Sequence, residues 1–393
     1  MDIKGFQFSA VEAAVKKPGR KDLALIFSEV PANACAVFTT NTVKAAPVLL
    51  SMEHIKSGST QVLIVNSGNA NACTGDQGMI AAHETSRLVA EGLGLADDAV
   101  QVSSTGVIGV QMPMDRIRAA IPAAIDGLAS GTLDDVASAI MTTDTFPKME
   151  ARSGVAGGTN YTVAGIAKGA GMIMPNMATM LSFIISDAAI EPAFLQQAFR
   201  RAVDTSFNAI TVDGDMSTND TCLIMANGMA GNPVISAGSP AAANFEQLLG
   251  EVLLSLAKQI VKDGEGATKF VEIRVTGAAS GVEAKQAAMA IANSSLVKTA
   301  FFGQDANWGR IFAAVGYSGA TVNQARLSLS FDNVVMARNG IFAGDNAEAR
   351  GTEILKQKEF TVSVDLGVGN GAATVYTSDL THEYVSINAD YRS

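Results

Sequence analysis

The sequence predicts a mixed α/β protein with two domains, and three observations support that prediction. The chain has 393 residues, which is too many for a single simple hydrophobic core. Hydrophobic residues make up 48% and charged residues 17%, with 37 glycines, which is typical of a tightly packed globular chain and not of a disordered one. Short apolar runs that end at turn residues alternate with amphipathic stretches of helical period.

The N-terminal half alternates between the two periodicities. Apolar runs ended by turn residues predict strands at 23–30, 34–40, 62–71 and 99–110, and residues 1–75 have strand character throughout. Helical periodicity predicts helices at 79–94, 114–129 and 134–141. Residues 151–190 return to strand character, with glycine-rich bends at 157–158 and 169–171.

Two amphipathic helices and a glycine-rich boundary organise the remainder. The helices are expected at 192–208 and 244–264. The glycines around 277–281 suggest a division into residues 1–277 and residues 278–393. The second domain is then expected to contain a helix at 284–295 and strands at 326–337 and 360–369.

Charge and hydropathy argue against nucleic-acid binding and against a membrane span. The net charge is −10 with no Lys/Arg run, so we expect no nucleic-acid surface. The N-terminus lacks a targeting pattern, and polar residues interrupt the most apolar window, residues 172–190, so we expect no membrane span. The three cysteines (Cys35, Cys73 and Cys222) are far apart, which favours reduced thiols in a cytoplasmic protein.

The common catalytic and metal-binding motifs are missing. There are three histidines, none with zinc-ligand spacing, and no G-x-S-x-G or phosphate-loop motif. Residues 213–220 resemble a calcium loop superficially, but Ser217 and Thr218 stand where a ligand and the required glycine should be. We interpret this stretch as a polar turn and expect no metal.

The segment 164–187 is the strongest candidate for a reactive site. A glycine-rich bend leads through Pro175 to Thr179 and then to the buried strand pattern MLSFIIS. A threonine at the start of a strand is common, so Thr179 alone indicates nothing.

The whole segment resembles the active-site signature of the ornithine acetyltransferase family of arginine biosynthesis. The matching residues are Lys168-Gly-Ala-Gly-Met-Ile-Met-Pro-Asn-Met-Ala-Thr-Met-Leu181. Further blocks of the family occur in the same order, at 65–71, 104–109, 141–148, 206–209, 263–268, 307–310 and 388–393. The resemblance therefore spans almost the entire chain.

The resemblance implies an enzyme that cleaves itself between Ala178 and Thr179, which frees the Thr179 amine and makes its hydroxyl the nucleophile. An α-amine has a pKa of about 7.7–8.0, so it can act as the base without a histidine. The implied reaction moves acetyl from N-acetylornithine to Thr179 and then to glutamate. No residue decides whether acetyl-CoA is also a substrate; we expect a bifunctional enzyme because the sequence resembles arginine-pathway members. No cofactor is implied.

The resemblance also assigns roles to other residues. Thr105 and Gly106 match the oxyanion hole, although a strand-end turn explains the same residues. The positions that match substrate contacts are Thr142 (or Thr143), Lys168, Thr179, Glu265, Asn388 and Ser393. The alternative for Lys168 and Glu265 is an ordinary surface lysine and an exposed turn residue.

The family fold is an α/β/β/α sandwich with a smaller C-terminal domain, related to autoprocessed aminopeptidases. Fragments 1–178 and 179–393 are expected to stay together as an α2β2 heterotetramer. Three alternatives stay open: an aminopeptidase or amidase on the same scaffold, a monofunctional ornithine acetyltransferase, and a binding protein with an inactive site.

Overall fold

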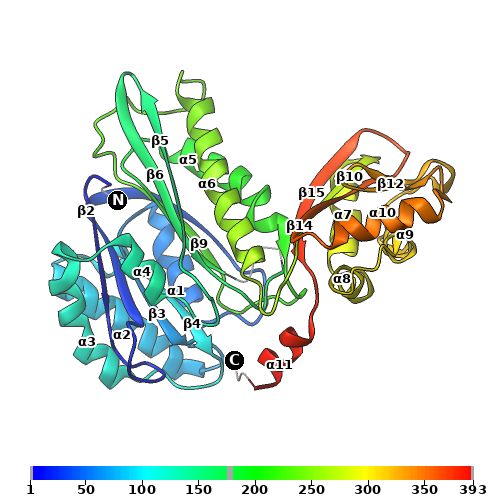
Figure 1. Ribbon diagram of the computed structural model, residues 1–393. Helices are drawn as coiled ribbons and strands as arrows, with labels where there is room; N and C mark the ends of the chain where they lie inside the picture. Colours follow the sequence, from blue (N-terminus) through cyan, green and yellow to red (C-terminus); the bar gives the residue numbers. More distant parts are fainter. Residues whose placement is uncertain (1–2, 175–179, 391–393) are drawn as a thin grey trace.

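An eight-stranded sheet forms the centre of the larger part of the molecule (Figure 1). The computed structural model describes residues 3–174 and 180–390. Seven strands follow the order β4-β3-β2-β9-β7-β6-β5, and β1 pairs with β2. These strands are β1 (Phe6–Val11), β2 (Leu23–Phe38), β3 (Ser59–Asn69), β4 (Val100–Val107), β5 (Lys148–Ala156), β6 (Thr159–Lys168), β7 (Leu181–Ser186) and β9 (Thr221–Ala226).

The long strand β2 belongs to both halves of this sheet. Its first half pairs with β3 and its second half with β9, and the register shifts between Phe27 and Ala32. Such an irregularity bends a strand, so the sheet folds over on itself. One buried cluster accordingly contains Leu63 from β3 together with Phe183 from β7. The two halves of the sheet therefore pack face to face.

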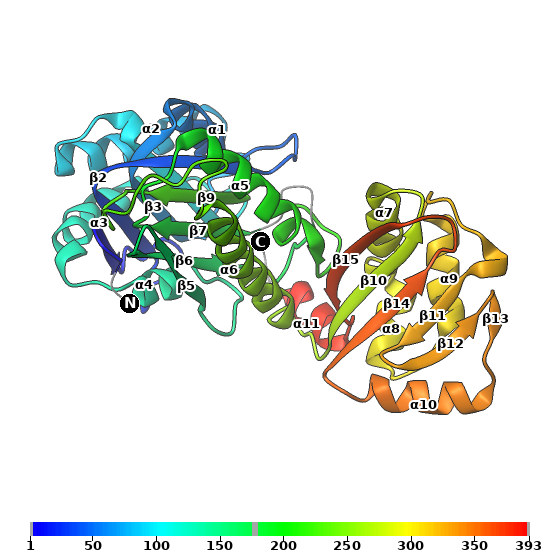
Figure 2. The ribbon, with the colours of Figure 1, turned by 90° about the horizontal axis from the view of Figure 1, so that it is seen from above.

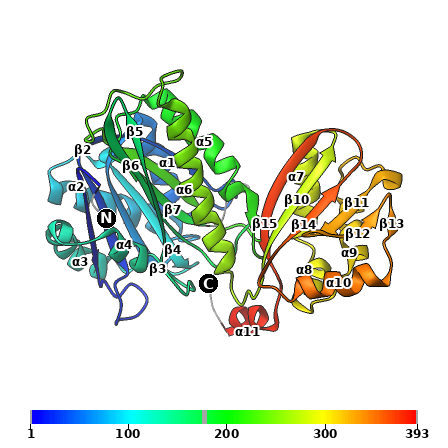
Figure 3. The same ribbon diagram turned by 45° about the horizontal axis from the view of Figure 1, so that its top comes forward.

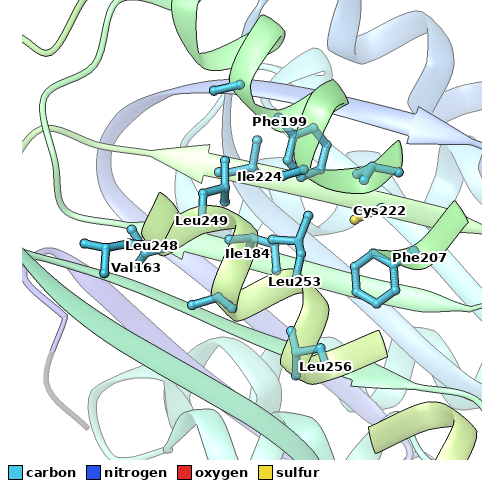
Figure 4. Close-up of a cluster of buried hydrophobic side chains, with 14 of the residues drawn as sticks. Val163, Ile184, Phe199, Phe207, Cys222, Ile224, Leu248, Leu249, Leu253 and Leu256 are labelled. Carbon is cyan, nitrogen blue, oxygen red and sulfur yellow. The ribbon is translucent and has the colours of Figure 1, made fainter. Parts of the chain in front are cut away.

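Helices cover the outer face of each half (Figure 2). The helices of the larger part are α1 (Ala46–His54), α2 (Gly75–Leu93), α3 (Met114–Asp126), α4 (Leu133–Ala139), α5 (Pro192–Asp204) and α6 (Ala242–Lys262). On β3, Leu63 faces the inner core, whereas Ile64 packs with residues of α2 and α3. On the other half, the α6 residues Leu249 and Leu253 lie over Ile184 (Figure 4). These layers confirm the predicted α/β/β/α sandwich.

A seven-stranded sheet organises the smaller C-terminal part. Its order is β13-β12-β11-β14-β10-β15-β8, and a separate buried core lies between it and its helices. The strands are β8 (Ile210–Thr211), β10 (Phe270–Ala278), β11 (Ser328–Phe331), β12 (Val334–Arg338), β13 (Ile341–Phe342), β14 (Glu359–Asp365) and β15 (Gly371–Ser378). The helices after α6 are α7 (Gly281–Ala292), α8 (Ser295–Phe302), α9 (Trp308–Tyr317), α10 (Asp345–Leu355) and α11 (His382–Asp390).

The two parts share backbone pairing. β8 precedes α6 in the chain, yet it pairs with β15 in the second sheet. β10 runs across the predicted boundary between residues 277 and 278. The division at that boundary stays a prediction.

The last helix, α11, leaves the second sheet and lies beside the larger part (Figure 3). The Thr381 hydroxyl donates to the Gly266 carbonyl at 2.7 Å, and the Tyr384 hydroxyl donates to Asp213 at 3.3 Å. These contacts hold the end of the described chain against the turn that follows α6 and the segment that follows β8.

Two local predictions are wrong. Residues 46–54 form a helix inside a region expected to contain only strands, because proline at its first turn favours helix initiation there. The two strands expected at 23–30 and 34–40 are one bulged strand. Pro31, a turn-forming residue, lies in the irregular middle of β2, where the ladder tolerates it.

Candidate active site

One pocket contains six of the residues proposed from the sequence. They come from β4, the loop after α4, the end of β6, the turn after α6, and α11: Thr105, Gly106, Thr142, Lys168, Glu265 and Asn388. Thr143 also lines this pocket. We call this the acyl pocket. Residues from 105 to 388 therefore meet at a single site.

Backbone geometry fixes Thr105 and Gly106 at the pocket wall. Gly106 has φ +134°, and a Cβ built there would lie 2.3 Å from the Gly68 carbonyl carbon on β3. A side chain would collide with the neighbouring strand, so glycine is required at this position. The Asn219 amide donates to the Ser104 carbonyl at 2.9 Å and holds the preceding residue in place.

Lys168 lies at the end of β6 beside a buried group of charges. Its ammonium is 3.9 Å from Asp144 Oδ2, and its side chain is about one-tenth exposed. Lys148 Nζ lies between Asp144, at 2.7 Å, and Asp263, at 2.5 Å, and is completely buried. Asp144 also accepts the Thr142 N–H at 2.9 Å and the Gly169 N–H at 2.6 Å. The Asp144 carboxylate thus connects the pocket wall that contains Thr142 with the wall at the end of β6.

This charge group shifts two pKa values. Burial raises the pKa of Asp144, but the charges of Lys168 and Lys148 outweigh it and hold the pKa well below its usual range. Burial lowers the pKa of Lys168, and the Asp144 charge opposes this. Lys168 is therefore easier to deprotonate than a surface lysine.

Glu265 and Asn388 form the side of the pocket nearest α11. The Asn388 amide donates to Glu265 Oε2 at 2.8 Å. The Glu265 backbone N–H donates to the Ala170 carbonyl at 2.9 Å, and its carboxylate lies against Gly171, where a Cβ would meet Oε2 at 2.3 Å. The glycine-rich bend after β6 therefore leaves room for this carboxylate.

The predicted nucleophile and its cleavage partner, Thr179 and Ala178, lie outside the described residues, as does Ser393. The described chain on either side of the cleavage segment is closely held. Lys168 pairs with Leu181 across β6 and β7, and Asp213 accepts the Met172 and Ile173 N–H groups at 2.6 and 2.8 Å. The roles assigned to the site residues stay predictions.

Asp220 is an unusual neighbour of this segment. It is buried, and its Oδ2 has no hydrogen-bond partner among the residues that the structure describes. Burial raises its pKa well above the usual carboxyl range, and a hydrogen bond from the Met180 backbone N–H partly opposes the shift. That N–H belongs to the peptide bond that joins residues 179 and 180.

Several residues at the site had no predicted role. Ser217 and Asn219 line the acyl pocket, and Asp213 holds the 172–173 turn, although residues 213–220 were interpreted as a polar turn. The high density of Asp, Ser and Asn in residues 213–220 is the sequence feature that could have indicated a role at the site. Asp144 and Asp263 lie in the family blocks 141–148 and 263–268, but their contacts with Lys168 and Lys148 join segments that are far apart in the sequence.

Within residues 3–174 and 180–390, no group of three or more His, Cys, Asp or Glu side chains is placed to hold a metal ion. No helix in the same ranges is both long and apolar enough to cross a membrane.

Comparison with known proteins identifies the family. The model of the ArgJ family matches residues 7–393. The chain belongs to the ArgJ family. A relative from Geobacter sulfurreducens, named arginine biosynthesis bifunctional protein ArgJ, is 69% identical over 393 residues and covers all of both chains. A relative of the same name from Syntrophotalea carbinolica is 54% identical over 391 residues, which are 100% of this chain and 99% of that one.

A solved structure of the ArgJ family supports the same assignment. The arginine biosynthesis bifunctional protein from Bacillus halodurans is 46% identical with a TM-score of 0.53, and the match covers 54% of this chain and 100% of that chain. ArgJ-family membership confirms the predicted family and an acyltransferase of arginine biosynthesis that acts on small molecules.

Proposed function

We propose that this ArgJ-family enzyme transfers acetyl from N-acetylornithine to glutamate through an ester on Thr179, with acetyl-CoA as a second acetyl donor. The observation that carries the proposal is the single pocket that contains Thr105, Gly106, Thr142, Lys168, Glu265 and Asn388. The names of the close relatives, which are bifunctional proteins of arginine biosynthesis, support it.

The nucleophile is made by self-cleavage. The Thr179 hydroxyl attacks the Ala178 carbonyl carbon, the C–N bond breaks, and the amide becomes an ester while the nitrogen takes the proton. Water then opens the ester to give an Ala178 carboxylate and a Thr179 with a free amine and hydroxyl. A small residue at position 178 leaves room for this attack.

Acetyl transfer uses the same hydroxyl twice. The Thr179 amine takes the hydroxyl proton as oxygen attacks the acetyl carbonyl, and the proton passes to the leaving amine of ornithine or thiolate of CoA. The Thr105 hydroxyl and the Gly106 N–H stabilise each oxyanion. The glutamate amine then attacks the acetyl-threonine ester and regenerates the hydroxyl.

Charge in the acyl pocket suits the α-carboxylate that ornithine and glutamate share, and the cationic side chain of ornithine. A cation at Lys168 pairs with the α-carboxylate, and the carboxylate of Glu265 receives the side-chain ammonium of ornithine. Thr142 and Asn388 complete the polar wall, with Ser393 as a further contact from the tail. Tail closure over the site keeps water from hydrolysing the ester.

The two fragments stay together as an α2β2 assembly in the cytoplasm. The solved Bacillus halodurans chain matches 54% of this chain, and residues 179–393 are 215 of the 393 residues, a similar share. A separate chain of that length is what cleavage before Thr179 would produce.

An assay with isotope-labelled acetyl donors tests the proposal. Labelled N-acetylornithine plus glutamate should give labelled N-acetylglutamate and ornithine, and labelled acetyl-CoA should give the same product. Without glutamate, little free acetate should form. Rapid release of acetate in place of transfer would identify a hydrolase and contradict the proposal.

A further inference from the structure

A second pocket adjoins the acyl pocket and contains a cluster of cations. Its lining includes Lys16, Lys17, Arg20, Gly68 and Thr142. Thr142 also lines the acyl pocket, so the two pockets share a wall. The segment Lys16-Lys-Pro-Gly-Arg-Lys21 has four cationic residues among six, in a chain whose net charge is −10. This short basic run contradicts the expectation that the chain has no Lys/Arg run.

Arg20 is fixed by neutral groups. Its Nη2 donates to the Ser67 hydroxyl at 3.1 Å and to the carbonyls of Ala139 and Met141 at 3.3 and 2.5 Å. No carboxylate lies within ion-pair distance of Arg20 or Lys17 in the described part of the chain. A half-buried guanidinium held by neutral acceptors keeps its full positive charge and favours a nearby anion.

The loop that contains these cations is itself held in place. Asp22, which also lines the pocket, accepts the N–H groups of Ala13 and Val15 at 2.7 and 2.6 Å with its two oxygens. The Gly19 N–H donates to Glu12 Oε1 at 2.9 Å. Both nearby carboxylates are thus engaged by backbone donors of the loop, which orders the loop that carries Lys16, Lys17 and Arg20.

We propose that this basic pocket binds the phosphate groups of the acyl-CoA donor. The inference rests on the proposed function, in which acetyl-CoA delivers acetyl to Thr179. A long pantetheine arm separates the thioester of CoA from its diphosphate, so a phosphate site must lie beside the acyl pocket and not inside it. The basic pocket has that position because Thr142 belongs to both. N-Acetylornithine carries no phosphate and does not use these cations.

Steady-state kinetics with two thioesters tests the assignment. Acetyl-CoA and acetyl-pantetheine share the reacting end, but only acetyl-CoA has the diphosphate and the 3′-phosphate. In the double variant Lys16→Ala/Lys17→Ala, the KM for acetyl-CoA should rise about tenfold, because two exposed cations that contact the phosphate groups are lost. The KM for acetyl-pantetheine and that for N-acetylornithine should stay the same.

A matched control lies in the same loop. Lys21 pairs with Asp135 at 2.6 Å and does not line the pocket, so Lys21→Ala should leave all three KM values unchanged. Inorganic pyrophosphate should compete with acetyl-CoA in the unaltered enzyme and far less in the double variant. If pyrophosphate binds but the KM for acetyl-CoA does not change, the pocket is an inorganic-anion site and the assignment to CoA is overturned.

Failure of the proposed function has a different signature. If the unaltered enzyme turns over N-acetylornithine but neither thioester, acetyl-CoA is not a substrate. The part of the proposed function that involves acetyl-CoA is then wrong, and so is the basic-pocket assignment. If the unaltered enzyme uses acetyl-CoA and the double variant has the same KM for it, only the basic-pocket assignment is overturned. An equal rise in KM for both thioesters would also overturn it.

Discussion

At the scale of single residues, one pocket brings together hydroxyl, amide and charged side chains, with no histidine among its described lining residues. The motif 168–181 predicts Thr179 as the nucleophile from the sequence alone, because the residues of the motif are contiguous. The blocks 141–148 and 263–268 contain Asp144, Lys148 and Asp263, but they do not show that these side chains form one buried charge group. Lys148 and Asp263 meet only after β5 and the end of α6 pack together. Local patterns describe neighbours in the chain, whereas ion pairs of this kind depend on the fold.

Replacing Thr105 with valine tests the oxyanion assignment. Thr105→Val keeps the shape of the side chain but removes the hydroxyl donor, so kcat should fall about 100- to 1,000-fold with little change in KM. Acetyl-transfer kinetics measure this, and Thr105→Ser should retain most of the rate. A valine variant with unchanged kcat would show that the threonine belongs to an ordinary strand end.

Replacing Asp144 with asparagine tests the buried charge group. Loss of one partner from a buried ion pair should lower the free energy of unfolding at pH 7 by roughly 3–5 kcal/mol. The folded pKa of Asp144 is lowered from an ordinary value of 3.8, so its contribution is present above that pH and is lost as the pH falls toward the folded pKa.

Urea unfolding of Asp144→Asn at several pH values measures both effects. The difference from the unaltered enzyme should be largest near neutral pH and should shrink below about pH 4. The exposed Asp98 gives a control, because Asp98→Asn should change stability little at any pH. An Asp144→Asn difference that stays constant with pH would contradict an ionised Asp144.

At the scale of elements, α11 was not predicted, although it contributes Asn388 to the acyl pocket. No helix was predicted there, because its sequence has a weak apolar pattern and the described helix has no buried residue. Its place depends instead on polar contacts with Gly266 and Glu265. By contrast, α6 has a continuous apolar face, and its predicted range 244–264 lies close to the observed Ala242–Lys262.

Removing residues 388–393 tests the role of the tail. The truncation deletes Asn388 and its contact with Glu265 but keeps Thr381 and Tyr384, which hold α11 to the larger part. We expect the KM for N-acetylornithine to rise about tenfold, because charged-group hydrogen bonds contribute about 1.5–3 kcal/mol. Circular dichroism should show an unchanged fold. An unchanged KM for N-acetylornithine would contradict the proposal that the tail completes the site.

At the scale of the whole molecule, the sheet topology explains how the fragments on the two sides of the predicted cleavage site can stay associated. β6 comes before the cleavage segment and β7 after it, yet they pair along Val163–Lys168. β2 and β9 pair in the same way across the predicted cleavage site. The layered fold followed from the family resemblance. The pairing of β8 with the second sheet did not, since a two-residue strand leaves no periodic pattern.

Fragments 1–178 and 179–393 should therefore copurify. A tag on the first fragment should retain the second through size-exclusion chromatography in high salt, because buried apolar faces and strand pairing hold them together. Only denaturant should separate them. Dissociation in salt alone would contradict a core shared by both fragments.

Intact mass spectrometry with N-terminal sequencing tests the central claim most directly. The unaltered protein should give two fragments, the second beginning Thr179-Met-Leu-Ser-Phe-Ile, whereas Thr179→Ala should remain one chain without acetyl-transfer activity. A single uncut chain that nevertheless transfers acetyl would contradict Thr179 as an N-terminal nucleophile.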